Sequence, residues 1–150
     1  MELKFRIETI RQIEAHFALN RQYKWVKDEI IEFQQSIEIE QKSVDNILGV
    51  VVRFYSDSEK QPFRFSVAWE GAFVFEKLPA KELLERIAHI NCASIIFPYV
   101  RESVADLTRR ASITPLNLQP MNFVALYDEK HKSASQSATK KPVKKSKIKK

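Results

Sequence analysis

The chain has 150 residues, a net charge of +6 and 44% hydrophobic residues, which is enough to build one domain around its own core without metals or disulfides. Its single cysteine excludes an intrachain disulfide, and no segment approaches the ~20 apolar residues of a membrane-spanning helix. The charged residues among the first ten positions leave no apolar signal-peptide segment, so we expect a cytoplasmic protein.

Strand-like patterns fill the first half of the chain. Residues 3 to 19 alternate between apolar and polar with a one-residue slip near Thr9, which predicts a bulged strand with one buried face. Residues 20 to 29 are polar and are interpreted as a crossover loop. Three further strands are predicted at 30 to 40, at 48 to 54 and at 63 to 78 with a bulge or bend at Gly71, joined by a polar turn at 42 to 46 and a hairpin connection at 56 to 62.

Helical patterns follow. Pro79 and Ala80 open a predicted helix whose apolar residues recur every 3.6 positions as it runs toward Phe97. Pro98 suits the first turn of a second helix, where its missing N–H costs nothing. That helix is amphipathic, with one apolar stripe formed by Val100, Val104, Leu107 and Ala111. An extended segment follows, and a last helical turn or two are expected at 122 to 129.

Strands followed by helices predict an α+β domain, with a four-stranded antiparallel sheet and two main helices on one face. We place this domain at residues 1 to 129, which hold all 19 acidic residues and 16 of the 25 basic ones, a net charge of −3. Residues 130 to 150 contain nine Lys and no acidic residue. Because this segment has few large apolar side chains, we expect a disordered Lys-rich tail.

No catalytic or metal-binding constellation stands out. The three histidines, His16, His89 and His131, have no Cys or His partner at metal-ligand spacing. Cys92 has no nearby His–acid pair and is interpreted as a small buried residue. Asp106 is expected to pair with neighbouring arginines on its helix, and two glycines are too few for a Gly-rich phosphate loop. We therefore expect no enzyme activity, no metal and no cofactor.

Three apolar residues interrupt the polar crossover loop: Tyr23, Trp25 and Val26. One interpretation is that the loop folds back and packs them into the core. The other is that they form a flexible wall of an apolar binding surface, because aromatic side chains grip varied apolar partners with few rotatable bonds. The sequence leaves both open.

The segments IIFPYVRE (95 to 102), LTRRA (107 to 111) and PLNLQPMNFVALY (115 to 127) carry a family signature. They closely resemble the motifs of the protein-export chaperone SecB family, at matching spacing over some thirty residues. The opening FRIETIRQIEAHFAL also resembles the first strand of that family, and Glu70–Gly71 falls where the family has a Gly pair. The resemblance covers roughly residues 3 to 129 and leaves the Lys-rich tail outside.

The resemblance implies a homotetramer, built as a dimer of dimers, and an ATP-independent holdase. Such a chaperone keeps unfolded precursor proteins in long apolar grooves and delivers them to the motor ATPase of the Sec translocase. Many weak contacts along one client would then add up through avidity. The residues that we expect to line the groove are Tyr23, Trp25, Val26, Leu116, Leu118, Met121 and Phe123.

The motor-docking surface of the family is acidic, and the resemblance maps it to Glu14, Ala18, Arg64 and Ser66. Only Glu14 is acidic here, and Arg64 places a positive charge where a basic partner would dock. These departures weaken the expectation that the motor docks at this surface.

Two alternatives stay open. The first is a SecB-like chaperone dedicated to one client, such as an antitoxin. The second is a nucleic-acid-associated protein that acts through its Lys-rich tail, whose binding would fall steeply with salt. For the chaperone itself we expect no specific nucleic-acid partner.

Overall fold

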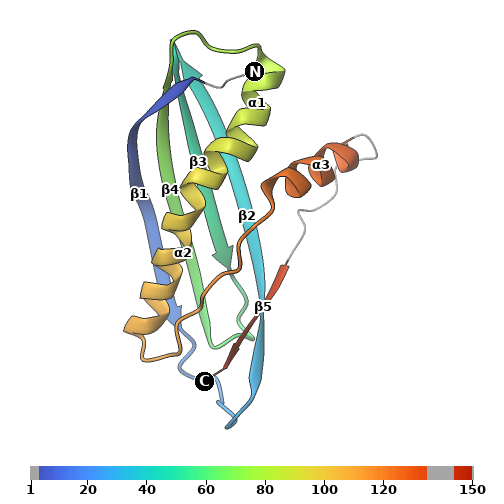
Figure 1. Ribbon diagram of the computed structural model, residues 1–150. Coiled ribbons are helices and arrows are strands. Elements are labelled where there is room, and N and C mark those ends of the chain that lie inside the picture. The colour runs from blue at the N-terminus through green and yellow to red at the C-terminus, as the bar shows by residue number, and fades with distance from the viewer. Residues whose placement is uncertain (1–3, 135–143, 150) are drawn as a thin grey trace.

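The computed structural model describes residues 4–134 and 144–149. Its elements in chain order are β1 (Phe5–Leu19), β2 (Ile30–Val44), β3 (Ile47–Ser56), β4 (Phe63–Phe75), α1 (Lys81–Arg86), η1 (Ile87–Cys92), α2 (Ala93–Arg110), α3 (Phe123–Ala134) and β5 (Lys144–Lys149). The strand order is β1-β4-β3-β2-β5, and every neighbouring pair is antiparallel. The helices lie on one side of the sheet (Figure 1). The predicted α+β class is confirmed, and β1 to β4 form the predicted four-stranded antiparallel sheet, to which β5 adds a fifth strand.

The core lies between the sheet and the long helix. Alternate residues of β3 and β4 point toward the helix and are fully or almost fully buried, among them Leu48, Val50, Val52, Phe63, Phe65 and Val67. Val100 and Val104 of α2 are completely buried against them. The opposite face of the sheet carries polar side chains and has no helix over it in the described residues. We call this second surface the open face.

β2 and β3 extend further than their sequence patterns predicted, whereas β4 is shorter. The turn expected at 42 to 46 is a tight hairpin, because β2 continues to Val44 and β3 begins at Ile47. Asp45 takes a positive φ of 54° there, a conformation that Asp tolerates better than most residues. β4 ends at Phe75 rather than near Leu78.

Gly71 does not mark a bulge in β4, contrary to the prediction. Its register with β3 is regular, with Val50 opposite Gly71. A Cβ atom at this position would lie 2.7 Å from Cε2 of Phe73 and 3.1 Å from Cδ1 of Ile96. Glycine is therefore needed because the buried ring of Phe73, together with Ile96 of α2, fills the space that a side chain would occupy.

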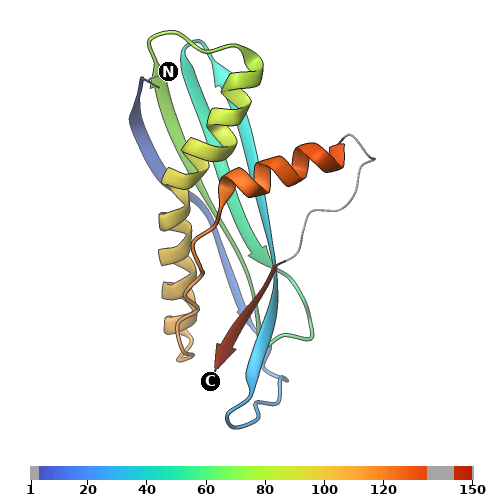
Figure 2. The same cartoon turned by 45° about the vertical axis from the view of Figure 1, so that its right-hand side comes forward.

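The irregular strand is β1, at the edge of the sheet. Its register with β4 shifts between Ile7 and Thr9, as the slip predicted, and again between Gln12 and Glu14. The expected buried face is only partly formed: Phe5 and Phe17 pack against the core, but Ile7, Ile13 and Leu19 are 48%, 44% and 46% exposed. An edge strand has a neighbour on one side only, and the long helix packs mainly on β3 and β4, which leaves much of β1 uncovered (Figures 1 and 2).

The two helices predicted on either side of Pro98 are one continuous helix. α1, the π-helical segment η1 and α2 follow each other without a break from Lys81 to Arg110, and Pro98 lies inside α2. Pro98 and Ser94, the residue four positions before it, are both exposed. A missing backbone hydrogen bond is cheapest on a solvent-facing side of a helix, because water can reach the free carbonyl. The second main helix is α3, which is longer than the turn or two expected.

The chain between α2 and α3 is held to α2 by side-chain hydrogen bonds. The buried hydroxyl of Thr108 accepts a hydrogen bond of 2.9 Å from the backbone N–H of Leu116. Arg101 Nε donates to the carbonyl of Leu118 at 2.8 Å. These contacts fasten the extended segment along the helix before the chain turns outward into α3 (Figure 2).

The Lys-rich tail has regular structure where we expected disorder. α3 continues to Ala134, and Lys144–Lys149 form β5, which pairs with Ile30–Gln35 of β2. An exposed strand edge can order even a polar segment, because the backbone supplies the pairing groups. Residues 135–143 and Leu3, the first residue of the predicted strand, lie outside the described residues.

Candidate functional site

The loop that carries the candidate aromatic residues is anchored at its start. Asn20 donates from Nδ2 to the carbonyls of Glu59 and Gln61 at 3.0 and 3.2 Å. Its backbone N–H bonds to the carbonyl of Pro62 at 2.8 Å. Residues 20–29 are thereby tied to the connection between β3 and β4, and Asp28 takes a positive φ of 63° near the far end.

Tyr23 and Trp25 are half-buried and touch each other. Their ring centroids are 5.3 Å apart at an interplanar angle of 74°, an edge-to-face contact, and both pack against the rim of the core. Val26 is 58% exposed. The loop therefore has features of both interpretations. The rings of Tyr23 and Trp25 partly join the core, and Val26 presents an apolar side chain to solvent.

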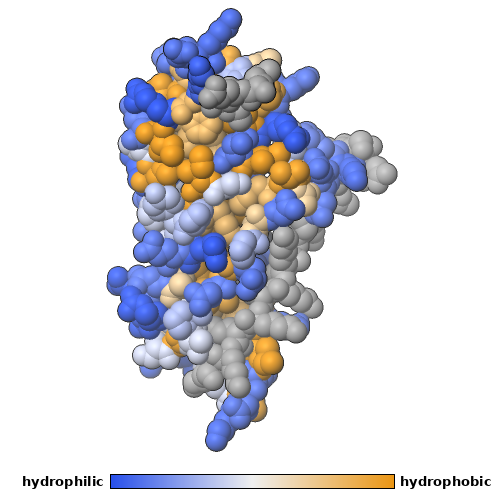
Figure 3. All heavy atoms as spheres, viewed as in Figure 1, coloured by the Kyte–Doolittle hydropathy of each residue, from blue (hydrophilic) through white to orange (hydrophobic). Residues whose placement is uncertain are grey.

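Two residues that we did not select belong to the same end of the molecule. Leu19, the last residue of β1, and Ile30, the first residue of β2, flank the loop and are 46% and 60% exposed. Together with Tyr23, Trp25 and Val26 they form what we call the loop-end surface. Figure 3 shows small apolar areas at the lower end of the molecule and larger apolar areas in its upper part. The alternation of apolar and polar residues did not single out Leu19 and Ile30, because it does not show where the sheet ends and an apolar side chain becomes exposed.

The other predicted groove residues occupy a different environment. Leu116, Leu118 and Phe123 are 3%, 2% and 4% exposed and belong to the core of the chain, while Met121 packs at its rim. Three of the four thus present almost no free apolar surface in a single chain. The aromatic rings of Phe123 and Phe97 lie 5.5 Å apart, edge to face, so Phe123 fastens the start of α3 to α2.

A shallow cleft does run between α2 and the extended segment. It has a volume of about 230 Å³ and is lined by Pro98, Arg101, Glu102, Ala105, Asn117 and Leu118. Its lining is mixed rather than apolar. Leu118 is the one predicted groove residue that borders it.

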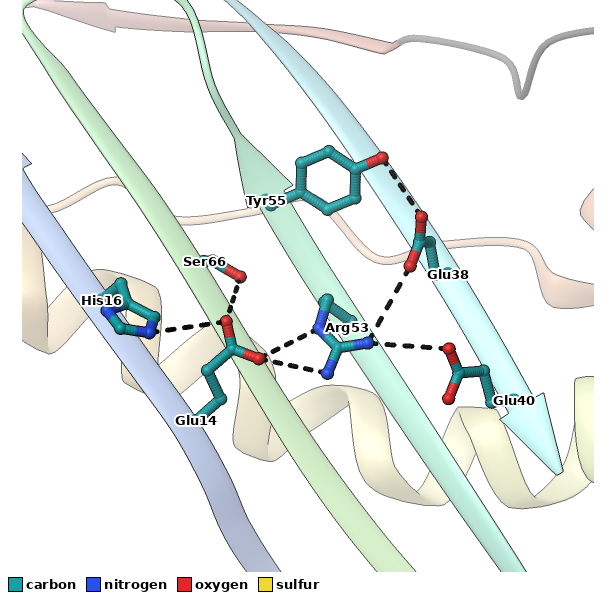
Figure 4. Close-up of polar contacts among 7 residues, drawn as sticks. All are labelled: Glu14, His16, Glu38, Glu40, Arg53, Tyr55 and Ser66. Atoms are coloured by element: carbon teal, nitrogen blue, oxygen red, sulfur yellow. Dashed lines mark hydrogen bonds and ion pairs between the residues drawn. The ribbon is translucent and has the colours of Figure 1, made fainter. Parts of the chain in front are cut away.

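Two of the predicted docking positions, Glu14 and Ser66, lie on the open face within a polar network centred on Arg53 (Figure 4). Glu14 bonds to Arg53 Nη2 at 3.1 Å through its Oε2, and Ser66 Oγ donates to its Oε1 at 2.8 Å. Glu38 and Glu40 lie 3.9 and 3.7 Å from Arg53 Nη1. One guanidinium thus holds three carboxylates from two strands. The only cue in the sequence was a lone arginine inside the apolar run of β3.

Glu14 is held in its charged form. The hydrogen bond from Ser66 is the largest cause that lowers the pKa of this carboxyl, and Arg53 adds to it. The carboxylate is already compensated by these two partners. Glu14 therefore offers a basic partner less attraction than a free surface carboxylate would.

The remaining two docking positions sit beside a cavity on this face. Ala18 and Arg64 are opposite each other in the β1–β4 pair, and Arg64 Nη1 lies 3.6 Å from Asp57. The cavity has a volume of about 530 Å³, and both residues line it together with Glu38, Arg53, Tyr55 and Ser66. All four predicted docking positions thus lie on the open face, three of them at the cavity wall, but the surface mixes both charges.

The residues considered for catalysis have structural roles. Burial raises the pKa of the Cys92 thiol to about 12, so the thiol stays protonated. Asp106 pairs with Arg109 and Arg110, as expected. Within residues 4–134 and 144–149, no group of three or more His, Cys, Asp or Glu side chains is placed to hold a metal ion. None of the helices described here has the length and apolar character needed to cross a membrane.

Comparison with known proteins gives a consistent result. The chain is 31% identical over 97 residues to the protein-export protein SecB of Nitrosomonas eutropha, which covers 65% of this chain and 60% of that protein. It is 37% identical over 100 residues to SecB of Methylobacillus flagellatus, covering 63% of each. The chain thus spans a little under two thirds of the length of the curated relatives it matches.

Among solved structures, a SecB-like chaperone of Mycobacterium tuberculosis, in complex with a ChAD peptide from the HigA1 antitoxin, has the same fold. Its TM-score is 0.67 at 19% identity, covering 78% of this chain and 90% of that one. The family model described as preprotein translocase subunit SecB matches residues 7–134. On the strength of that match, which spans the sheet, the long helix and α3, the chain belongs to the SecB family.

Proposed function

We propose that this chain is an ATP-independent holdase, which binds unfolded precursor proteins and delivers them for export through the Sec translocase. The family match over residues 7–134 carries the proposal. The curated relatives at 31% and 37% identity are protein-export proteins. The residues of the candidate site add a physical reason, because they bring apolar side chains to the surface.

The loop-end surface suits a client that has no fixed structure. Val26 and Ile30 are 58% and 60% exposed, and the rings of Tyr23 and Trp25 lie beside them at the rim of the core. Burying apolar client side chains there contributes roughly 25 cal/mol per Å². No single sequence is required, since aromatic and aliphatic side chains accept many apolar partners. Several such surfaces in one assembly would hold a long client by avidity.

The test compares two valines that are equally exposed. Val26, on the loop, and Val44, at the far end of β2, are both 58% exposed. We expect Val26→Ser to weaken the suppression of aggregation when a denatured, slow-folding precursor is diluted into buffer, and Val44→Ser to leave it unchanged. Light scattering measures the suppression. If the unmodified protein does not suppress aggregation at one assembly per client, the holdase proposal is rejected.

A second candidate is a chaperone dedicated to one client. The neighbouring SecB-like chaperone was solved with a peptide from an antitoxin, and this chain has the same fold. Affinity purification from the source cells separates the two functions. One stable, stoichiometric partner favours the dedicated chaperone, and a broad set of unfolded precursors favours general export.

Delivery to the motor ATPase would depend on the mapped docking positions. Of the mapped docking positions, Glu14 is already bonded to Arg53 and Ser66, and Arg64 adds a positive charge. We expect weak capture of the motor by the unmodified chain and stronger capture after Arg64→Leu with Ser66→Glu. Unchanged capture by the double variant would mean that this face is not the docking surface.

A further inference from the structure

The first six residues of β2 have no strand beside them on the β3 side. Pairing of β2 with β3 begins at Ser36 opposite Tyr55, and β3 ends one residue later. In place of a strand, the side chain of Gln61 accepts a hydrogen bond of 2.9 Å from the backbone N–H of Gln34. Residues 30–35 therefore project beyond the main sheet, next to the loop-end surface.

The other edge of this projecting segment is occupied by the chain's own C-terminus. β5 pairs antiparallel with it, from Ile30 opposite Lys149 to Gln35 opposite Lys144. Successive N–H groups of a strand point to opposite edges. Since the N–H of Gln34 points to Gln61, those of Ile31, Phe33 and Gln35 point to β5. The edge is thus able to accept an extended backbone, and β5 is the strand seated on it.

The edge also offers contacts that the C-terminal strand does not use fully. Gln35 is 4% exposed, and its Nε2 has no hydrogen-bond partner among the described residues. Ile30 is 60% exposed although it is paired with β5. A buried donor without a partner is costly, and an exposed isoleucine leaves apolar area unburied. A strand richer in apolar residues would bury more area at Ile30 than the sequence KKSKIK does.

We propose that the edge of β2 at Ile30–Gln35 is a strand-accepting site for client polypeptide, and that β5 fills it as a tethered stand-in until a client displaces it. The occupant is an extended, apolar segment of an unfolded chain. It binds by adding an antiparallel strand, so backbone groups supply the affinity and no sequence is read. The inference rests on the proposed holdase function. It adds a mechanism by which the edge of β2, which could otherwise pair with other chains and aggregate, stays covered.

Tethering explains why a weakly apolar segment suffices to cover the edge. Nine residues join the end of α3 at Ala134 to the start of β5 at Lys144. A connection of this length keeps β5 at a high local concentration beside the edge, because the pairing is intramolecular. A client must outcompete the tethered β5, so only segments that make several apolar contacts at the loop-end surface would displace it.

The test uses full-length chains and two measurements. Ser146→Pro with Ile148→Pro removes two N–H groups that face β2, because these residues lie opposite Phe33 and Ile31. Ser146→Thr with Ile148→Val is the matched control that keeps both donors. Lys145→Gln with Lys147→Gln tests whether the positive charge of these lysines alone affects exchange at β2 or client binding. Hydrogen exchange reports on β2, and the binding of a reduced, carboxymethylated globular protein, which stays unfolded, reports on client affinity.

We expect the proline variant to lose exchange protection at Ile31, Phe33 and Gln35, while Gln34 stays protected by Gln61. The unfolded probe should bind this variant about tenfold more tightly, since a tethered competitor has been removed. The matched control should behave as the unmodified chain does, and so should the lysine variant.

Three results would overturn the inference. Unchanged exchange at the three amides would mean that β5 does not cover the edge. Lost protection without tighter binding would mean that clients do not use the edge, and protection that depends on protein concentration would mean that the strand comes from a second chain. If protection is lost without tighter binding, aggregation suppression by the unmodified chain would still support the holdase function. If no variant binds the unfolded probe, the holdase function itself fails.

Discussion

Single residues decide how closely the long helix approaches the sheet. Trp69 of β4 donates from Nε1 to Ser103 Oγ at 2.8 Å, and Gln12 of β1 reaches the same hydroxyl at 3.3 Å. Ser103 thus joins two strands to α2 through one atom. Gly71 of β4 also affects this packing, because the absence of a side chain leaves room for the ring of Phe73 and for Ile96 of α2.

Gly71→Ala should therefore destabilise the protein. The added methyl would lie 2.7 and 2.9 Å from ring atoms of Phe73 and 3.1 Å from Ile96, and both side chains are fully buried and have little room to move. Overpacking of this kind costs about 1–3 kcal/mol. Gly49→Ala is the control, because its methyl would meet only a backbone oxygen at 3.5 Å. Urea unfolding of both variants measures the difference, and equal midpoints would contradict the packing argument.

Thr108→Val should loosen the segment that leads to α3. Valine keeps the shape but removes the oxygen that accepts the N–H of Leu116 at 2.9 Å in a fully buried position. An unsatisfied buried donor costs about 1–3 kcal/mol. Thr108→Ser retains the hydroxyl and should lose less. The free energy of unfolding gives the first comparison, and faster amide exchange at Leu116 in the valine variant alone would locate the effect.

At the scale of elements, the π-helical segment η1 brings an unusual run of side chains inward. Ile87, Ala88 and His89 are consecutive and all buried. The wider turn of a π-helix changes which residues face the core. It places His89 5.8 Å from the ring of Tyr127 on α3, and Tyr127 in turn stacks edge to face on His131 at 4.2 Å. η1 is thus the element against which α3 packs.

This contact should make stability depend on pH. Burial, followed by nearby Lys130, lowers the pKa of His89 from 6.5 to about 4, whereas Glu85 opposes the shift and His131 adds to it. Between these two values the unfolded chain binds a proton that the folded chain does not. The free energy of unfolding should therefore fall as the pH drops from 6.5 to about 4, by roughly 1 kcal/mol per pH unit, and level off below.

Chemical unfolding across pH 4 to 7 checks this for His89. The variant His89→Gln should lose this part of the slope, and the surface variant His16→Gln should keep it because His89 is intact. A slope that survives in His89→Gln would assign the acid sensitivity to other groups.

At the scale of the whole molecule, the exposed apolar residues of β1 favour assembly. Ile7, Ile13 and Leu19 are each close to half exposed along one edge strand, and unprotected edges of this kind invite pairing with another chain. The upper part of the helix-bearing face also gathers apolar side chains (Figure 3). Both features are compatible with the homotetramer that we expect from the resemblance to the SecB family.

A matched pair of variants tests the assembly. Ile13 on β1 and Val124 on α3 are both 44% exposed. We expect the unmodified chain to have the mass of four chains in multi-angle light scattering, Ile13→Lys to shift it toward smaller species, and Val124→Lys to leave it unchanged. A desolvated lysine without a partner opposes association. A monomeric unmodified chain would refute the tetramer.

Local patterns in the sequence were enough to predict the elements whose structure depends mainly on the residues within them. The alternation of β3 and β4 and the stripe Val100 and Val104 were enough to locate buried faces, because side-chain period follows directly from backbone geometry. The motif from Ile95 to Tyr127 was likewise enough to identify the family. The slip near Thr9 indicated a bulge for the same local reason.

Tertiary structure alone decided what depended on neighbours in space. Whether Ile13 is buried depends on which strand lies at the edge, and whether Leu118 lines a groove or joins the core depends on how the extended segment lies on α2. Pro98 is tolerated within one long helix because its face is exposed, and Lys144–Lys149 form a strand because β2 offers an open edge. Burial and strand pairing are properties of contacts between distant segments, which a one-dimensional pattern does not contain.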